Sequence, residues 1–191
     1  MMLKALALGL ILSVAANVAA RAEPLFDAYQ ALCVKTGAEA PATLAAADAA
    51  GWMPLPQPLL QQLSKAAAVD GADGRMKSDA AGIQLLIAGH KTMPIGPANV
   101  DVRFCAVATT AAVADALKSQ LAAWAAVPPE PGLSATDRTG YAFTDAHGVH
   151  TVLTKPNDDQ ALALLRTGHV TMAFIQESKG LNLLAFAVPS I

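Results

Sequence analysis

The chain has 191 residues, with 13 Lys and Arg against 15 Asp and Glu, and 54% of its residues are hydrophobic. The formal net charge of −2 and the lack of any basic cluster argue against nucleic acid and anionic membranes as partners. The length is that of a single domain, large enough to bury most of its apolar surface.

The N-terminus has the three parts of a secretory signal. Lys4 supplies a positive charge, an apolar run follows, and Ala-Arg-Ala at residues 20–22 forms an A-x-A cleavage site. The apolar run is about 16 residues, shorter than the roughly 20 that a membrane-spanning helix needs. This difference favours a cleaved signal over a membrane anchor.

We therefore expect residues 1–22 to be a signal peptide, cut after Ala22 in preference to Ala20. Residues 23–191 would form one mature α+β domain. The expected location is the periplasm or the medium, with no stable membrane insertion after cleavage. A lipid anchor on Cys33 is disfavoured, because this residue lies well beyond the apolar run.

The mature chain begins with segments that have helical periodicity. In residues 25–36, Phe26, Tyr29 and Cys33 share one face, and Gly37 suits the position after the helix end. Further helices are predicted over residues 41–50 and 59–68. The polar, Gly-broken stretch that follows, residues 69–79, is expected to be a loop.

Two strands are predicted next, over residues 82–89 and 100–109. Side chains alternate along a strand, so Cys105 points away from the face that carries Phe104. The second half continues with a helix over residues 111–124, capped by Thr110. Its other predicted elements are a hairpin with its turn at 145–148, a helix over 157–167 with a capping box from Asn157 to Gln160, and a hairpin over 170–188 that turns at 177–180.

The expected fold class is α+β, with N-terminal helices followed by a largely antiparallel sheet. From residue 80 the expected element order is ββαββαββ. Two helices would pack on one face of the sheet, the face carrying Phe104, Met172, Phe174 and Phe186.

Cys33 and Cys105 are the only cysteines. In an oxidising compartment two cysteines most simply pair, and the loop closed here would be worth about 4 kcal/mol. The alternative is two separate buried thiols. A nucleophilic Cys33 is disfavoured at the C-terminal half of a helix, and two distant cysteines are too few ligands for a metal.

The cysteines also belong to a wider pattern. The first helix reads F-x-x-Y-x-x-x-C, an Ala-rich helix ends in Gly-Trp, and a strand carries C-x-V, formed by Phe26, Tyr29, Cys33, Gly51, Trp52, Cys105 and Val107. Over roughly the first half of the mature chain this pattern resembles small exported alpha-proteobacterial proteins of unknown function. The resemblance implies an exported location and a disulfide, and it implies no mechanism.

Histidines are the first candidates for chemistry. His147 and His150 form H-x-x-H near Asp145, a spacing that zinc proteins use when a third ligand is close. Here the pair crosses a predicted turn, so the two rings are expected to point in different directions. His90 is expected at a strand end or in a loop, and His169 follows the glycine that ends a helix. No metal site, cofactor motif or phosphate-binding loop is expected.

These observations favour a non-catalytic binding or accessory module of the cell envelope, with another protein or an envelope component as its partner. The alternative is a small periplasmic hydrolase or metal-dependent enzyme that uses His90 or the pair of His147 and His150. A protease inhibitor that presents the Pro-rich loop has no residue-level support. Long loops are often functional, so a binding surface is expected near residues 69–79 or 125–139, beside Trp124 and Arg138.

Overall fold

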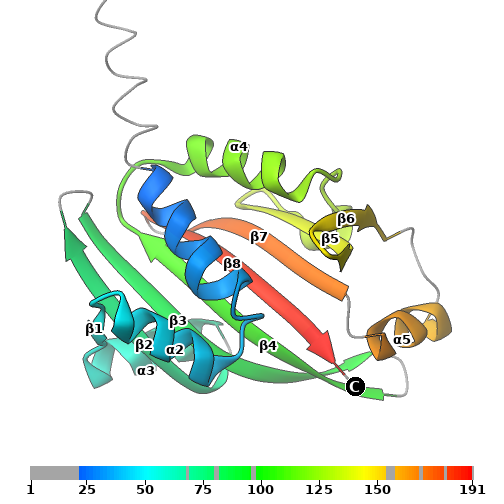
Figure 1. Ribbon diagram of the computed structural model, residues 1–191, viewed down its shortest axis with the longest axis horizontal. Coiled ribbons are helices and arrows are strands. Elements are labelled where there is room, and N and C mark those ends of the chain that lie inside the picture. Colours follow the sequence, from blue (N-terminus) through cyan, green and yellow to red (C-terminus); the bar gives the residue numbers. More distant parts are fainter. Residues whose placement is uncertain are drawn as a thin grey trace, which may run out of the picture.

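The computed structural model describes residues 22–67, 69–79, 82–95, 98–153, 158–167, 170–178 and 180–190. These residues form an α+β fold, in which an eight-stranded antiparallel sheet carries helices on both faces (Figure 1). Apart from Ala22, the expected leader lies outside the described residues. None of the helices within these ranges is long and apolar enough to cross a membrane.

The helices follow the predicted periodicity closely. The chain is α-helical over residues 22–29, continues as the π-helix η1 (Gln30–Val34), and turns at Gly37 with φ +62°. The other helices are α2 (Ala40–Ala49), α3 (Gln57–Ala67), α4 (Ala114–Ala125), the 3-10 helix η2 (Pro131–Leu133) and α5 (Asp158–Arg166).

The strands run in the order β1-β2-β3-β4-β8-β7-β5-β6 across the sheet, and every neighbouring pair is antiparallel. Their bounds are β1 (Met53–Pro54), β2 (Asp70–Asp79), β3 (Gly82–Ile95), β4 (Ala98–Thr109), β5 (Arg138–Ala146), β6 (Val149–Val152), β7 (Val170–Ser178) and β8 (Leu181–Ser190). A hairpin turn is confirmed within one residue of the predicted position: Ala146 pairs with Val149, and the two residues between them, His147 and Gly148, have positive φ.

The expectation of a loop over residues 69–79 is wrong. This segment is strand β2, which pairs with β3 through contacts such as Arg75 opposite Leu86. It lies near an edge of the sheet, and charged residues at edges protect a protein against unwanted pairing. Because β1 and β2 belong to the sheet, the expected order of six strands is also wrong for the sheet as a whole.

The sheet has two differently covered faces. The disulfide face carries Cys105, Val107 and Phe186, and it is covered by residues 22–34, α2 and α4. The opposite face carries Phe104 and is covered by α3 and α5, which contribute to two smaller clusters.

The expectation that two helices share one face is therefore wrong. α4 packs on the disulfide face through Leu117 and Leu121, whereas α5 packs on the opposite face. Phe186 was also assigned to the wrong face. It is the register partner of Cys105, and directly opposed residues of an antiparallel pair point to the same face.

The predicted cap of α4 is wrong as well. The helix begins at Ala114 after Val113, and no side chain caps its first turn. Thr109 Oγ1 instead accepts a hydrogen bond from the Ala111 amide at 3.2 Å, and Asn182 donates to the Ala111 carbonyl at 2.6 Å. These two bonds hold the segment between β4 and α4 in a bend, so the helix begins three residues later than predicted. Asn157, part of the predicted capping box of α5, lies outside the described residues.

Candidate functional site

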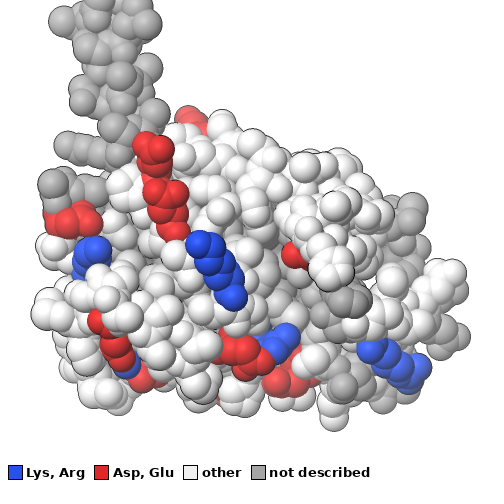
Figure 2. All heavy atoms as spheres, in the orientation of Figure 1, with Lys and Arg blue, Asp and Glu red and all other residues white. Residues whose placement is uncertain are grey.

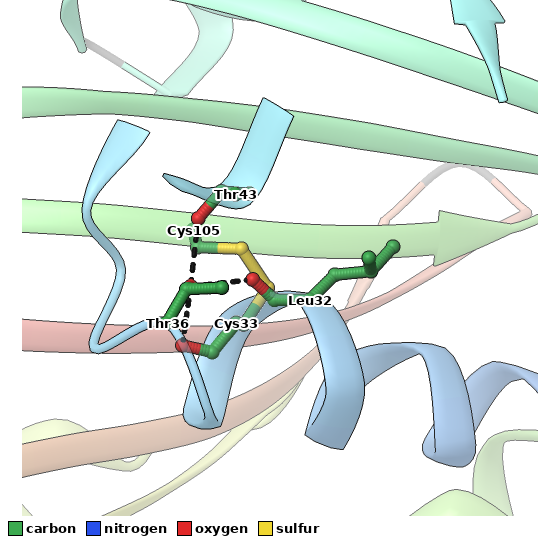
Figure 3. Close-up of a disulfide and its surroundings, with 5 residues drawn as sticks. All are labelled: Leu32, Cys33, Thr36, Thr43 and Cys105. Atoms are coloured by element: carbon green, nitrogen blue, oxygen red, sulfur yellow. Dashed lines mark hydrogen bonds between the residues drawn. A yellow bond between two sulfur atoms is a disulfide. The ribbon is translucent and has the colours of Figure 1, made fainter. Parts of the chain in front are cut away.

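The predicted disulfide is confirmed, and it joins the first helical segment to strand β4 of the sheet. Cys33 of η1 and Cys105 of β4 are bonded with a Cα–Cα distance of 5.3 Å, and both residues are fully buried (Figure 3). Thr36 fixes the turn beside the bridge, since its hydroxyl donates to the Leu32 carbonyl at 2.6 Å and lies 2.8 Å from the Thr43 hydroxyl. The bridge thus holds η1 across the disulfide face.

The clamped helix forms one wall of a cleft of about 440 Å³. Its second wall is the β5–β6 turn, residues 145–148, and its floor is the sheet itself. The cleft is lined by Val34, Gly37, Arg103, Asp145, Ala146, His147, Gly148, Thr171, Phe186 and Val188. This volume lies in the usual range of small-molecule sites, and such sites are mainly apolar with a few placed polar groups.

The cleft belongs to the side of the molecule seen in Figures 1 and 2. Charged side chains on that side are scattered, and the surface between them is mainly uncharged (Figure 2). The floor is apolar at Phe186 and Val188, and both residues are buried. Phe186 is 5% and Val188 is 7% exposed, so a ligand there would remove only a small apolar area from water.

Arg103 is the cation of the cleft. Its Nη1 forms an ion pair with Glu39 Oε1, at the residue that precedes α2. Its Nε is buried and has no hydrogen-bond acceptor among the described residues. A guanidinium has five N–H donors, so the pair with Glu39 leaves this group incompletely satisfied.

Asp145 is the anion of the cleft, on the wall opposite η1. Its Oδ1 accepts a hydrogen bond of 2.7 Å from the Gly148 amide, which closes the turn. Its Oδ2 lies 4.0 Å from Nε2 of His150, beyond hydrogen-bonding distance. One carboxylate oxygen is therefore used by the fold, and the other is left for a ligand.

His150 has a structural role. Its side chain is only 6% exposed, stacks on Phe143 with ring centroids 4.1 Å apart, and meets the edge of Trp124 at 5.0 Å. Nδ1 lies 3.0 Å from the Ala125 carbonyl, and since a carbonyl only accepts, Nδ1 carries the proton. This bond ties the end of α4 to strand β6.

The other candidate histidines do not belong to this cluster of rings. His147 is exposed on the turn and lines the cleft, and within the described ranges no three His, Cys, Asp or Glu side chains are placed to hold a metal. His90 lies outside the cleft lining, with Nδ1 3.3 Å from Asp101 Oδ1 and its side chain half exposed. His169 lies outside the described residues.

Replacing His150 and replacing His147 are expected to change the free energy of unfolding unequally. His150→Ala removes a buried ring and leaves the Ala125 carbonyl without its donor, so the free energy of unfolding is expected to fall by about 3 kcal/mol. His147→Ala changes an exposed turn residue and is expected to stay within about 0.5 kcal/mol. Urea unfolding measures both, and equal losses would contradict the structural role of His150.

Tyr29 is a second unusual polar group on this face. It is fully buried among Phe26, Trp124 and Phe186, and its hydroxyl has no hydrogen-bond partner among the described residues. Burial raises the pKa of the Tyr29 phenol well above its usual value. The neutral form is thus favoured in the folded state.

Tyr29→Phe is accordingly expected to raise the free energy of unfolding by about 1 kcal/mol at pH 7, because it removes an unsatisfied buried hydroxyl. The advantage of the variant should grow above pH 10. There the unfolded phenol loses its proton while the folded one keeps it, so wild-type stability falls as the pH rises. Urea unfolding at pH 7 and pH 10.5 checks this, and a less stable variant would reveal a partner for the hydroxyl.

Sequence patterns did not point to Arg103, Glu39 or Thr171. Arg103 lies two residues before Cys105 in a predicted strand, so alternation places the two side chains on the same face, and a cation on a face that must be buried was the available signal. The sequence predicts a binding surface near residues 69–79 or 125–139 instead. Residues 70–79 form strand β2, and in the second segment Arg138 donates from Nε to the Leu133 carbonyl at 2.8 Å, so this loop is bonded to itself.

Comparison with protein-family models, with curated proteins and with solved structures gives no match.

Proposed function

We propose that this protein is an exported, non-catalytic binding module of the cell envelope, and that its binding site is the cleft between η1 and the β5–β6 turn. Export is supported by the signal pattern of residues 1–22 and by the buried bridge between Cys33 and Cys105. Reducing compartments rarely keep such bridges.

One observation carries the proposal of binding: the cleft combines an apolar floor with separate polar groups that do not form a reaction centre. The only hydroxyl among its lining side chains is that of Thr171, and the hydrogen bonds of the described residues do not link it to His147. An activated nucleophile needs a base within hydrogen-bond reach. Groups that orient a ligand need no such link.

Filling the cleft tests this function. The protein is produced with its leader in a bacterium, purified from the exported fraction without denaturant, and weighed by native mass spectrometry. Thr171→Trp occupies the floor of the cleft, and Ile83→Trp is the matched control at an exposed position outside the lining.

We expect a bound species on the wild type and on Ile83→Trp that is absent from Thr171→Trp. Val34→Trp, from the opposite wall, should act like Thr171→Trp, and thermal unfolding of each variant shows that it is folded. The proposal fails if the wild type carries no ligand or if the cleft variants carry the same ligand.

A second candidate, a small hydrolase, is favoured by one contact. Asp101 lies 3.3 Å from His90 and could orient its ring as a general base. Hydrolysis of ester or peptide substrates that disappears in His90→Ala would support this function. Activity unchanged by that substitution would remove it.

A further inference from the structure

We propose that the cleft takes a short apolar peptide with free ends, whose C-terminal carboxylate binds Arg103 and whose N-terminal ammonium binds Asp145. This inference rests on the proposed function and names the ligand class. Its basis is the placement of one cation and one anion at opposite sides of an apolar floor.

The strand order sets the separation of these charges. Arg103 lies on β4 and Asp145 on β5, with β8 and β7 between them. Three spacings between neighbouring strands give roughly 14 Å across the sheet, and the register places Asp145 two residues further along its strand than the row of Arg103, so the two backbones are roughly 16 Å apart. The two side chains shorten this gap, and about two residues of extended peptide, at roughly 3.5 Å each, bridge what remains.

The floor between the charges suits side chains of an apolar peptide. Phe186 and Val188 of β8 lie between the strands that carry Arg103 and Asp145. Val34 adds an apolar contact from η1. A ligand with two charged ends and an apolar middle therefore matches the cleft along its length.

Each charged residue keeps bonding capacity for such a ligand. Glu39 holds Arg103 through Nη1 and fixes the guanidinium, and Nε is closed to solvent. The remaining N–H groups of the guanidinium can donate to a carboxylate, as arginine commonly does. At the other end, Asp145 uses Oδ1 for the turn, and Oδ2 can accept from an ammonium.

Blocking one end of the peptide at a time tests the two contacts separately. The probes are the dipeptide Ala-Phe, its N-acetyl form without the cation, and its C-terminal amide without the anion. Isothermal titration calorimetry on the full mature protein gives each dissociation constant. We expect Ala-Phe to bind at least tenfold more tightly than either blocked form.

Two variants assign each contact to a residue. Arg103→Met keeps an unbranched stem without the charge, and it should make Ala-Phe and its amide bind equally. Asp145→Asn keeps the oxygen that accepts from Gly148, and it should make Ala-Phe and its acetyl form bind equally. Arg103→Met should still bind Ala-Phe more tightly than the acetyl form, and Asp145→Asn should still bind Ala-Phe more tightly than the amide. Circular dichroism verifies that both variants are folded.

The inference is overturned if the three probes bind the wild type equally, or if none binds. Equal binding would mean that the cleft binds ligands without contacting their charged ends, and the proposed function would still hold. With no probe bound, the peptide class is wrong, and the native mass spectra of the cleft variants decide the proposed function on their own.

Discussion

Replacing both Cys33 and Cys105 by alanine is expected to lower the free energy of unfolding by about 4 kcal/mol. The bridge spans a sequence separation of 72 residues, and cross-linking so long a loop removes much of the entropy of the unfolded chain. The loss is a large share of the roughly 5–15 kcal/mol that stabilises a typical domain. Urea unfolding of wild type and variant without reductant measures it.

Reductant provides the matched control for this prediction. Wild-type protein in excess dithiothreitol should lose most of the same free energy, whereas the alanine variant should be unaffected by the reagent. Loosening η1 also removes one wall of the cleft, so ligand binding should weaken in parallel. A variant within about 1 kcal/mol of wild type would show that the clamp contributes little to stability.

Phe143→Ala is expected to produce the other large loss, about 3–5 kcal/mol. Phe143 is fully buried, stacks on His150 at 4.1 Å and meets the ring of Trp124 at 5.7 Å. Truncation would leave a cavity under the end of α4 and remove support from the β5–β6 turn. Urea unfolding reports the loss, and tryptophan emission reports the change around Trp124.

Phe26→Ala is the matched control, since this ring is only partly buried against the same core. Its loss should be clearly smaller than that of Phe143→Ala. Equal losses from the two variants would contradict the assignment of Phe143 to the centre of the core.

Much of the local structure was predictable because the signals are local. The face shared by Tyr29 and Cys33 gave the first helix, and positive-φ positions such as Gly37 marked its end. Side-chain alternation along β4 predicts that Cys105 and Phe104 point to opposite faces of the sheet, and the structure confirms this. The disulfide was predictable from the presence of two cysteines and from the expected leader.

Strand β2 was missed for a physical reason. Its segment D-G-A-D-G-R-M-K-S-D has the composition of a loop, and it forms a strand only because β3 offers a long partner. Arg75 binds Asp48 of α2 at 2.6 Å, which adds a tertiary contact. Pairing over a distance overrides local propensity here.

The distribution of helices over the two faces was missed because it depends on register between distant strands. Phe186 shares a face with Cys105 only through the pairing of β8 with β4. Strand β8 carries apolar residues on both faces, so alternation along it does not show which face Phe186 shares with β4.

The cleft was only half visible in the sequence. The H-x-x-H pattern near Asp145 draws attention to Asp145 and His147, and the structure places both on one wall. The floor and the opposite wall come from η1, β4, β7 and β8, which are far apart in the chain. A site assembled from such distant segments is set by topology, and local patterns do not reveal it.

The claim on which this account depends is that the chain is exported and carries a closed bridge between its first helix and its sheet. Intact-mass spectrometry after alkylation with iodoacetamide, without reductant, tests it directly. The account predicts a chain that begins after the leader, two hydrogen atoms lighter than its reduced form and without alkyl groups. A chain that keeps residues 1–22 and carries alkyl groups on both Cys33 and Cys105 would contradict it.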